Sequence, residues 1–83
     1  MRAYAPLHAW LVGQPGNVNN IPATFAQIEG VLGFTLPATA RQKSQWWENN
    51  PARHVQATAW LDAGFFTRDV NIPNETLTFS RDQ

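Results

Sequence analysis

Proline and glycine divide this chain of 83 residues into short segments, and their spacing limits every helix and strand that it can form. A proline fits the first turn of a helix but disrupts its interior, and a glycine often ends one. The six prolines and five glycines therefore predict short elements. We expect four helices, at about residues 6–12, 25–32, 37–47 and 51–63.

The second of these helices has the clearest start and end. Thr24 precedes it and Gln27 lies three residues later, which is the spacing of a capping box. Gly33 follows it as a residue that readily adopts the left-handed conformation found at helix ends. Its apolar positions fall on one face, at Phe25, Ile28 and Leu32. The pattern predicts an amphipathic helix with defined ends.

Three short strands are predicted, one before the second helix and two at the end of the chain. The first covers residues 18–23, where Pro22 favours an edge position in the sheet. The other two, Phe65–Ile72 and Thr76–Arg81, flank a segment typical of a type I turn, with Pro73 at its second position. These two strands form a predicted hairpin.

The hairpin is expected to bury one face against the helices. In the last strand, Leu77 and Phe79 alternate with polar residues. In the preceding strand, a matching apolar face is expected from Phe66, Val70 and Ile72. We expect Trp60 of the fourth helix to pack against Phe79 in the core.

The order of these elements predicts the fold class. A helix, a short strand, further helices and a C-terminal hairpin form an α+β fold that resembles a winged helix, with the hairpin as the wing. The strand near residues 18–23 would join the hairpin as a third strand. A chain of this length forms a single domain, residues 1–83.

Composition excludes several classes of protein. Charged residues make up 14% of the chain and aromatic residues 12%, the opposite of the balance in disordered proteins. Six basic and six acidic side chains give no net charge, so no general attraction to polyanions follows. The absence of cysteine excludes disulfides and thiolate metal sites. Without a membrane-length apolar run or a signal-peptide pattern, we expect a cytoplasmic protein that does not associate with membranes.

No arrangement of residues indicates catalysis. The two serines lie outside any nucleophile-elbow pattern, and neither histidine has a second histidine four residues away. The six acidic residues are scattered singly. We therefore expect a protein that is not an enzyme and that has no metal site and no cofactor.

The predicted binding surface centres on the junction between the third and fourth helices. Neighbouring helical residues point about 100° apart, so we expect Trp47 in the core and Trp46 at least partly exposed. Trp46 then either covers the helix junction of its own domain or serves as a contact residue. Basic and amide side chains nearby suit contacts to phosphates and base edges. The candidate binding residues are Arg41, Lys43, Trp46, Asn49, Arg53, His54, Gln56 and Arg68.

Nearly the whole chain, Tyr4 to Arg81, resembles a small uncharacterised family of prokaryotic and phage domains. The resemblance rests on the pattern TFxxIE, LPxxAxxxxxWWxN and HxQAxAWLxAGF, which begins here at Thr24, Leu36 and His54. The paired tryptophans and the string from His54 to Phe65 are its specific parts. The resemblance implies a protein of bacterial, archaeal or phage type in the cytoplasm, and no activity.

Two functions remain open at this stage. The first is a winged-helix module that binds duplex DNA, with the third or fourth helix in the major groove and the hairpin on the backbone. The second is a protein-interaction module, such as a phage or mobile-element factor that inhibits a host complex. Either is compatible with a homodimer.

The surface distinguishes these two functions. Convergence of Arg41, Lys43 and Arg53 favours DNA, with Glu75 and Asp82 outside the interface. An apolar patch around Trp46 favours a protein partner.

Overall fold

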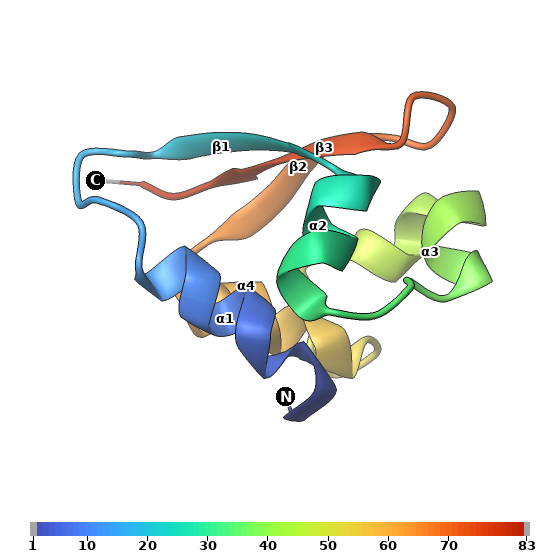
Figure 1. Ribbon diagram of the computed structural model, residues 1–83, viewed down its shortest axis with the longest axis horizontal. Helices are drawn as coiled ribbons and strands as arrows, with labels where there is room; N and C mark the ends of the chain where they lie inside the picture. The colour runs from blue at the N-terminus through green and yellow to red at the C-terminus, as the bar shows by residue number, and fades with distance from the viewer. Residues whose placement is uncertain (1, 83) are drawn as a thin grey trace.

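A three-stranded antiparallel sheet covered by helices on one face forms the protein (Figure 1). This computed structural model describes residues 2–82. It confirms the α+β class. In chain order the elements are η1 (Arg2–Tyr4), α1 (Ala5–Val12), β1 (Asn20–Thr24), α2 (Phe25–Leu32), α3 (Ala38–Gln42), η2 (Ser44–Trp47), η3 (Val55–Ala57), α4 (Thr58–Leu61), β2 (Phe66–Asn71) and β3 (Thr76–Ser80), where η denotes a 3-10 helix.

The strand order β1-β3-β2 places the last strand in the centre of the sheet. β1 pairs with β3 from Asn20 opposite Ser80 to Thr24 opposite Thr76. This pairing confirms the predicted third strand, although the strand begins at Asn20 rather than at residue 18. Pro22 lies on an edge strand, as expected of a residue that lacks a backbone donor.

A β-bulge in β2 changes which residues face the core. Arg68 pairs with Thr78 and Asn71 with Thr76, so Asp69 and Val70 together lie opposite a single residue. Within the bulge, Asp69 adopts the left-handed conformation, with a φ of 54°.

The extra residue separates the two ends of β2. Thr67 is buried before the bulge, whereas Val70 and Ile72 pack against the core after it. The prediction that Phe66 shares their apolar face is wrong, because Phe66 pairs with Ser80 and lies in register with the outward-facing Arg68.

Four aromatic rings form a column through the core. The Trp47 ring lies 5.0 Å from Phe25 and 5.9 Å from Trp60, measured between centroids. Trp60 in turn lies 6.1 Å from Phe79, and both are fully buried. The predicted contact between Trp60 and Phe79 is therefore confirmed.

The prediction that Trp46 is partly exposed is wrong. Its side chain is buried beside Trp47, with 4.6 Å between ring centroids, and contacts Tyr4 on its other side. Neighbouring residues of a 3-10 helix also point well apart, by about 120°. The two rings are buried by different partners: Trp47 packs against Phe25 and Trp60, and Tyr4 of η1 contacts Trp46.

The ends of α2 agree with the sequence. The Thr24 hydroxyl accepts a hydrogen bond from the Gln27 backbone N–H at 3.0 Å, and the Gln27 side chain accepts one from the Thr24 N–H at 2.8 Å. Gly33 ends the helix with a φ of 82°. The capping box thus fixes where β1 stops and α2 begins.

The third and fourth helices are much shorter than predicted. α3 ends at Gln42, and the predicted helix over 51–63 is a turn followed by η3 and the four-residue α4. Asn50 accepts a hydrogen bond from the Ala52 N–H within that turn. Tertiary contacts override the helical pattern, because both tryptophans of η2 and Trp60 of α4 turn inward.

Trp60→Ala should lower the free energy of unfolding by about 3–5 kcal/mol, because it empties the centre of the aromatic column. That loss approaches the whole stability of a small domain. Urea denaturation measures it. The matched control is Val55→Ala at an exposed position, which should change stability by less than about 0.5 kcal/mol. Equal melting of the two variants would contradict the described core.

Candidate nucleic-acid interface

The segment from Pro37 to Gln45 presents a nearly continuous exposed surface on α3 and the start of η2. Only Ala40 is buried, and its carbonyl accepts a hydrogen bond from the Trp47 indole N–H at 2.8 Å. This contact holds α3 against the core. The segment contains no acidic residue, and its exposed side chains are Pro37, Ala38, Thr39, Gln42, Lys43, Ser44 and Gln45.

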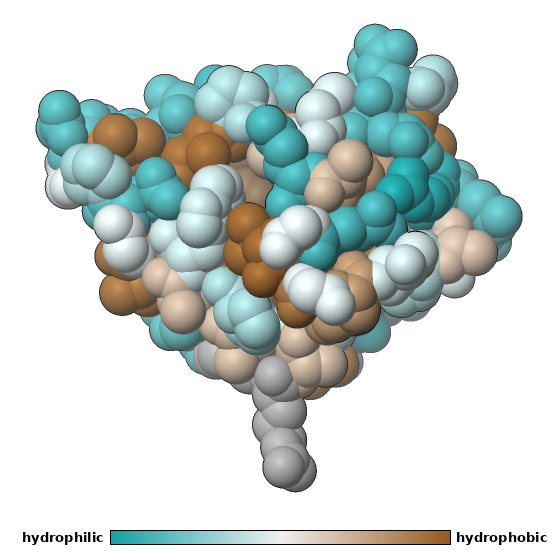
Figure 2. Space-filling view, in the orientation of Figure 1, coloured by the Kyte–Doolittle hydropathy of each residue, from teal (hydrophilic) through white to brown (hydrophobic). Residues whose placement is uncertain are grey.

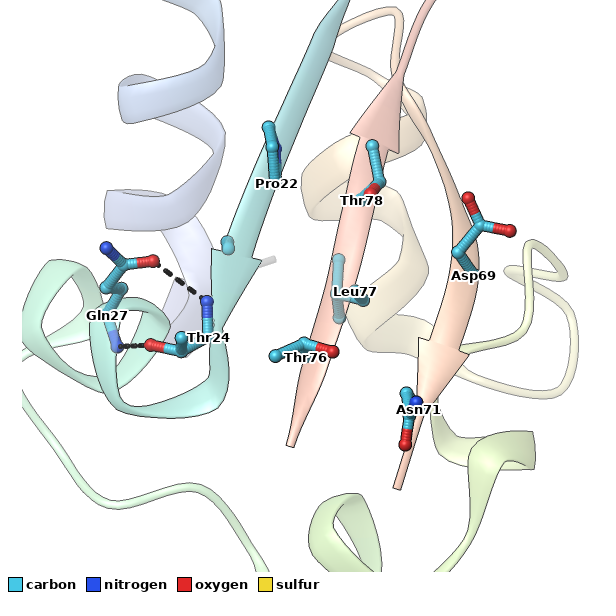
Figure 3. Close-up of a pocket in the computed structure, with 9 residues that line it drawn as sticks. Pro22, Thr24, Gln27, Asp69, Asn71, Thr76, Leu77 and Thr78 are labelled. Carbon is cyan, nitrogen blue, oxygen red and sulfur yellow. Dashed lines mark hydrogen bonds between the residues drawn. The ribbon is translucent and has the colours of Figure 1, made fainter. Parts of the chain in front are cut away.

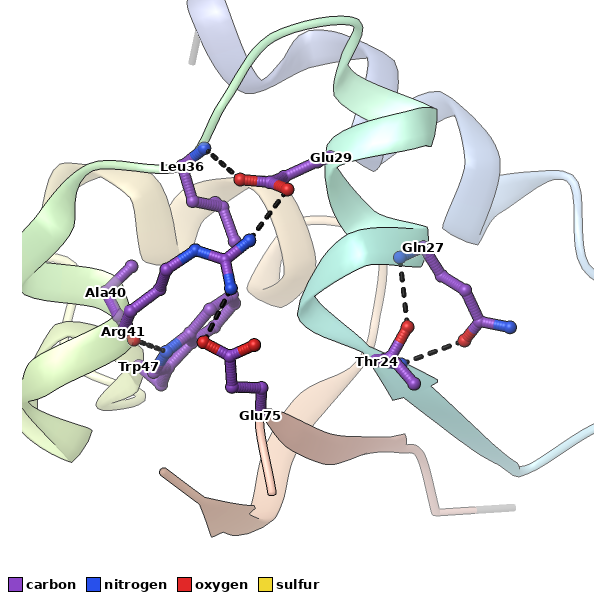
Figure 4. A network of polar contacts seen from close by, with 8 residues as sticks. All are labelled: Thr24, Gln27, Glu29, Leu36, Ala40, Arg41, Trp47 and Glu75. Carbon is purple, nitrogen blue, oxygen red and sulfur yellow. Dashed lines mark hydrogen bonds and ion pairs between the residues drawn. The ribbon is translucent and has the colours of Figure 1, made fainter. Parts of the chain in front are cut away.

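Arg41 of α3 connects three elements through two carboxylates (Figure 4). Its Nη2 donates to Glu29 Oε1 of α2 at 2.7 Å, and its Nη1 lies 2.6 Å from Glu75 Oε2 in the β2–β3 turn. The second Glu29 oxygen accepts from the Leu36 backbone N–H at 2.7 Å. Arg41 therefore holds α3 against α2 and also contacts the hairpin turn.

This network shifts the ionisation of its members. The Arg41 hydrogen bond and the Leu36 N–H, which outweigh partial burial, hold the pKa of Glu29 below its usual value. Hydrogen bonds to Glu75 and Glu29 raise the pKa of Arg41. Both shifts favour the charged forms, so the ion pairs persist at neutral pH.

The expected basic surface is smaller than the sequence suggested. Arg41 and Lys43 bring two positive charges to α3, while Glu29 and Glu75 bring two negative charges to the same place. Glu75, which was expected to lie away from a surface built on Arg41, contacts it directly. Lys43 and Arg53 are exposed and form no ion pair within residues 2–82.

Two predicted contact residues are engaged in holding the core together. The Asn49 side-chain oxygen accepts from the Trp60 indole N–H and the Thr67 backbone N–H, each at 2.9 Å, and its amide donates to the Thr67 carbonyl at 3.0 Å. Gln56 is buried and donates to the Trp46 carbonyl at 2.8 Å. The amide groups of Asn49 and Gln56 thus form hydrogen bonds with backbone groups and with the Trp60 indole inside the protein.

The remaining two predicted residues have polar contacts outside α3. His54 Nε2 lies 3.8 Å from Glu48 Oε2, beside the turn before η3. Arg68 lies on the open face of the sheet, where its Nη2 donates to Asn20 Oδ1 at 3.3 Å. The structure therefore does not bring the predicted residues into one site.

Sequence reasoning missed Glu29 and Glu75. Neither is close to Arg41 in the chain, and isolated acidic residues on a helix and in a turn are ordinary surface features. No local signal indicates that one guanidinium binds both.

The open face of the sheet carries a shallow hollow of about 480 Å³ (Figure 3). It runs along β1 and β3 beside the bulge of β2. Its lining mixes polar and apolar residues and includes no basic one, which makes it a poor site for phosphate. The lining residues are Pro22, Ala23, Thr24, Gln27, Asp69, Asn71, Thr76, Leu77 and Thr78.

A second hollow, of about 230 Å³, is apolar. It lies between α1, α2 and β1, on the side where Figure 2 shows brown apolar atoms reaching the surface. Trp10, Ile21, Ile28 and Val31 are among the apolar side chains that line it. This hollow is smaller than a typical ligand pocket, so it suits a side chain of a partner better than a small molecule.

Comparison with known proteins assigns the chain to a family. The family described as "Domain of unknown function (DUF7662)" matches residues 4–83. The chain belongs to this family. The match confirms the resemblance to an uncharacterised domain family and brings no activity with it. No curated protein and no solved structure matches the chain.

The described part of this DUF7662 member lacks two further features. Within residues 2–82, no group of three or more His, Cys, Asp or Glu side chains is placed to hold a metal ion. None of the helices described for the chain has the length and apolarity needed to cross a bilayer.

Asn49→Ala should destabilise the fold by about 1–3 kcal/mol, because it leaves the Trp60 indole N–H and Thr67 without their partner. Chemical denaturation measures the loss. Asn17→Ala, at an exposed loop position, is the matched control and should be close to neutral. If Asn49→Ala proved as neutral as its control, Asn49 would be free for a contact role.

The stability advantage of the wild type over Glu29→Gln should depend on pH. The lowered pKa of Glu29 means that its carboxylate stabilises the fold above the unfolded pKa, near 4.3, and that this contribution disappears as pH falls through the lower folded pKa. Glutamine still accepts from the Leu36 N–H. Denaturation between about pH 7 and pH 3 should therefore show the difference shrinking with acid, and a constant difference would contradict the ion pair.

Proposed function

We propose that this protein is a non-enzymatic cytoplasmic module of winged-helix type that binds duplex DNA, with α3 in the major groove and the hairpin turn on the backbone. The observation that carries this proposal is the fixed relation between α3 and the hairpin turn. The Arg41–Glu29 pair holds α3 against α2, and the bond from the Phe25 N–H to the Glu75 carbonyl holds the turn against the start of α2. A helix and a wing that contact the same duplex need such a fixed relation.

The arrangement of elements supports the proposal. α2 and α3 are consecutive helices joined by a short segment that begins with Gly33, as in a helix-turn-helix. The hairpin follows, and β1 completes its sheet, which is the order expected of a winged helix. The predicted alternative, the fourth helix, is unsuitable because Ala59 and Trp60 are buried and the helix packs between α1 and β2.

The surface of α3 has suitable chemistry for a groove. Ala38 is small enough for close approach, and Thr39, Gln42 and Gln45 offer neutral donors and acceptors for base edges. Lys43 supplies a charge for phosphate. No acidic side chain from this segment would repel the backbone.

The charge of the protein limits the affinity. The formal charge is zero, and Arg41 is matched by two carboxylates. Nonspecific attachment, which depends on neutralising phosphates, should therefore be weak and strongly reduced by salt.

Lys43→Ala should reduce the slope of log affinity against log salt by about 1, because it removes one phosphate contact. Fluorescence anisotropy with a short mixed-sequence duplex, between about 50 and 200 mM salt, measures the slope. Arg68→Ala is the control on the open sheet face and should leave the slope unchanged.

Two outcomes would contradict this assignment. An equal effect of Arg68→Ala would place the duplex on the sheet rather than on α3. No binding by the wild type at about 50 mM salt would end the DNA proposal, because electrostatic attraction is strongest there.

A protein partner is the second candidate, favoured by the apolar hollow between α1, α2 and β1. Trp46 cannot serve as its anchor because it is buried. The half-buried Val31 is the better point of contact. Val31→Asp would weaken a complex formed at this hollow and leave duplex binding through α3 unchanged, which separates the two functions.

A further inference from the structure

We propose that the Nη1 side of the Arg41 guanidinium is a phosphate-binding position, which the Glu75 carboxylate occupies in the free protein. An incoming phosphate group would replace Glu75 and keep the contact of Arg41 with Glu29. This inference rests on the proposed function and names the backbone contact of the same site. Glu75 in the hairpin turn would therefore compete with the phosphate group for Arg41.

The two carboxylates bound to Arg41 differ in how firmly they are held. Glu29 is 20% exposed, and its second oxygen accepts from the Leu36 N–H. Glu75 is 46% exposed, and its side chain has no contact besides Arg41 among the described polar interactions. Glu29 is therefore a fixed partner, whereas Glu75 can leave at little structural cost.

The position of the hairpin turn does not depend on the Glu75 side chain. The Phe25 backbone N–H donates to the Glu75 carbonyl at 2.9 Å, and the Glu75 N–H donates to the Ile72 carbonyl at 3.1 Å. These backbone bonds hold the turn by themselves. The Glu75 carboxylate is therefore not needed to position the turn, and its contact is with the Arg41 guanidinium.

The chemistry of arginine allows the exchange. A guanidinium binds carboxylates and phosphates through the same planar arrangement of N–H donors. With Glu75 withdrawn, Arg41 keeps one carboxylate partner, Glu29, and the nearby residue Lys43 makes the charge of this segment positive. The surface around Arg41 would then attract the phosphates of the DNA backbone, which the free protein attracts only weakly.

Glu75→Gln should raise affinity for a mixed-sequence duplex about three- to tenfold at 50 mM salt and steepen the salt slope by about 1, because one more phosphate is neutralised. Asp62→Asn removes the same charge at the exposed end of α4 and is the matched control. If the two variants gained affinity equally, the gain would reflect total charge and the proposal would be overturned.

Inorganic phosphate provides a test that does not require DNA. At a phosphate concentration near its dissociation constant, the Tm of Glu75→Gln should rise by about 2–3 °C relative to chloride of equal ionic strength. The wild type and the double variant Arg41→Gln/Glu75→Gln should show no such rise. Glu75→Ala repeats the measurement should the glutamine variant fold poorly.

The two readouts separate this inference from the proposed function. Phosphate stabilisation of Glu75→Gln without duplex binding by any variant would support the anion position and reject the DNA proposal. Duplex binding by the wild type, with no phosphate effect and no gain over Asp62→Asn, would support the DNA proposal and reject this inference. Absence of both responses would reject both.

Discussion

The aromatic column from Phe25 through Trp47 and Trp60 to Phe79 is the contact on which the rest of the fold depends. It joins α2, η2, α4 and β3, four elements that are far apart in the chain. Each indole also needs a hydrogen-bond partner inside the protein, and these partners come from Ala40 and Asn49. Packing and polar satisfaction together therefore determine the path of the chain between α3 and η3.

That requirement explains why the central helices are short. Trp47 must reach Phe25 and Trp60 while its indole N–H reaches the Ala40 carbonyl. The chain leaves the helix at the extended residue Lys43 and continues in η2, which brings Trp47 to these partners. Trp46, about 120° away around η2, is covered by Tyr4 of η1. The exposed face of the short α3 is therefore not part of the core.

Arg41 has the corresponding role on the surface. The guanidinium joins α2, α3 and the hairpin turn where no apolar contact could do so at such exposed positions. A residue that the sequence suggested as a direct contact for phosphate is thus also the residue that orients the candidate interface. Arg41 can both orient the interface and bind a phosphate only if one of its two carboxylate partners can be exchanged. Glu75 is the less firmly held of the two.

Local rules in the sequence determined the ends of α2, the hairpin turn and the α+β order of elements, because capping, turn geometry and alternation depend on residues a few positions apart. They also indicated the buried faces of α2 and β3. They could not determine the bulge that turns Phe66 outward, the burial of Trp46, or the hydrogen bonds that Asn49 and Gln56 form with Trp60 and with the Trp46 carbonyl. Those features depend on partners distant in the chain. Only the tertiary structure decided them. A polar side chain forms its hydrogen bonds with whichever unpaired donor or acceptor the folded chain places beside it.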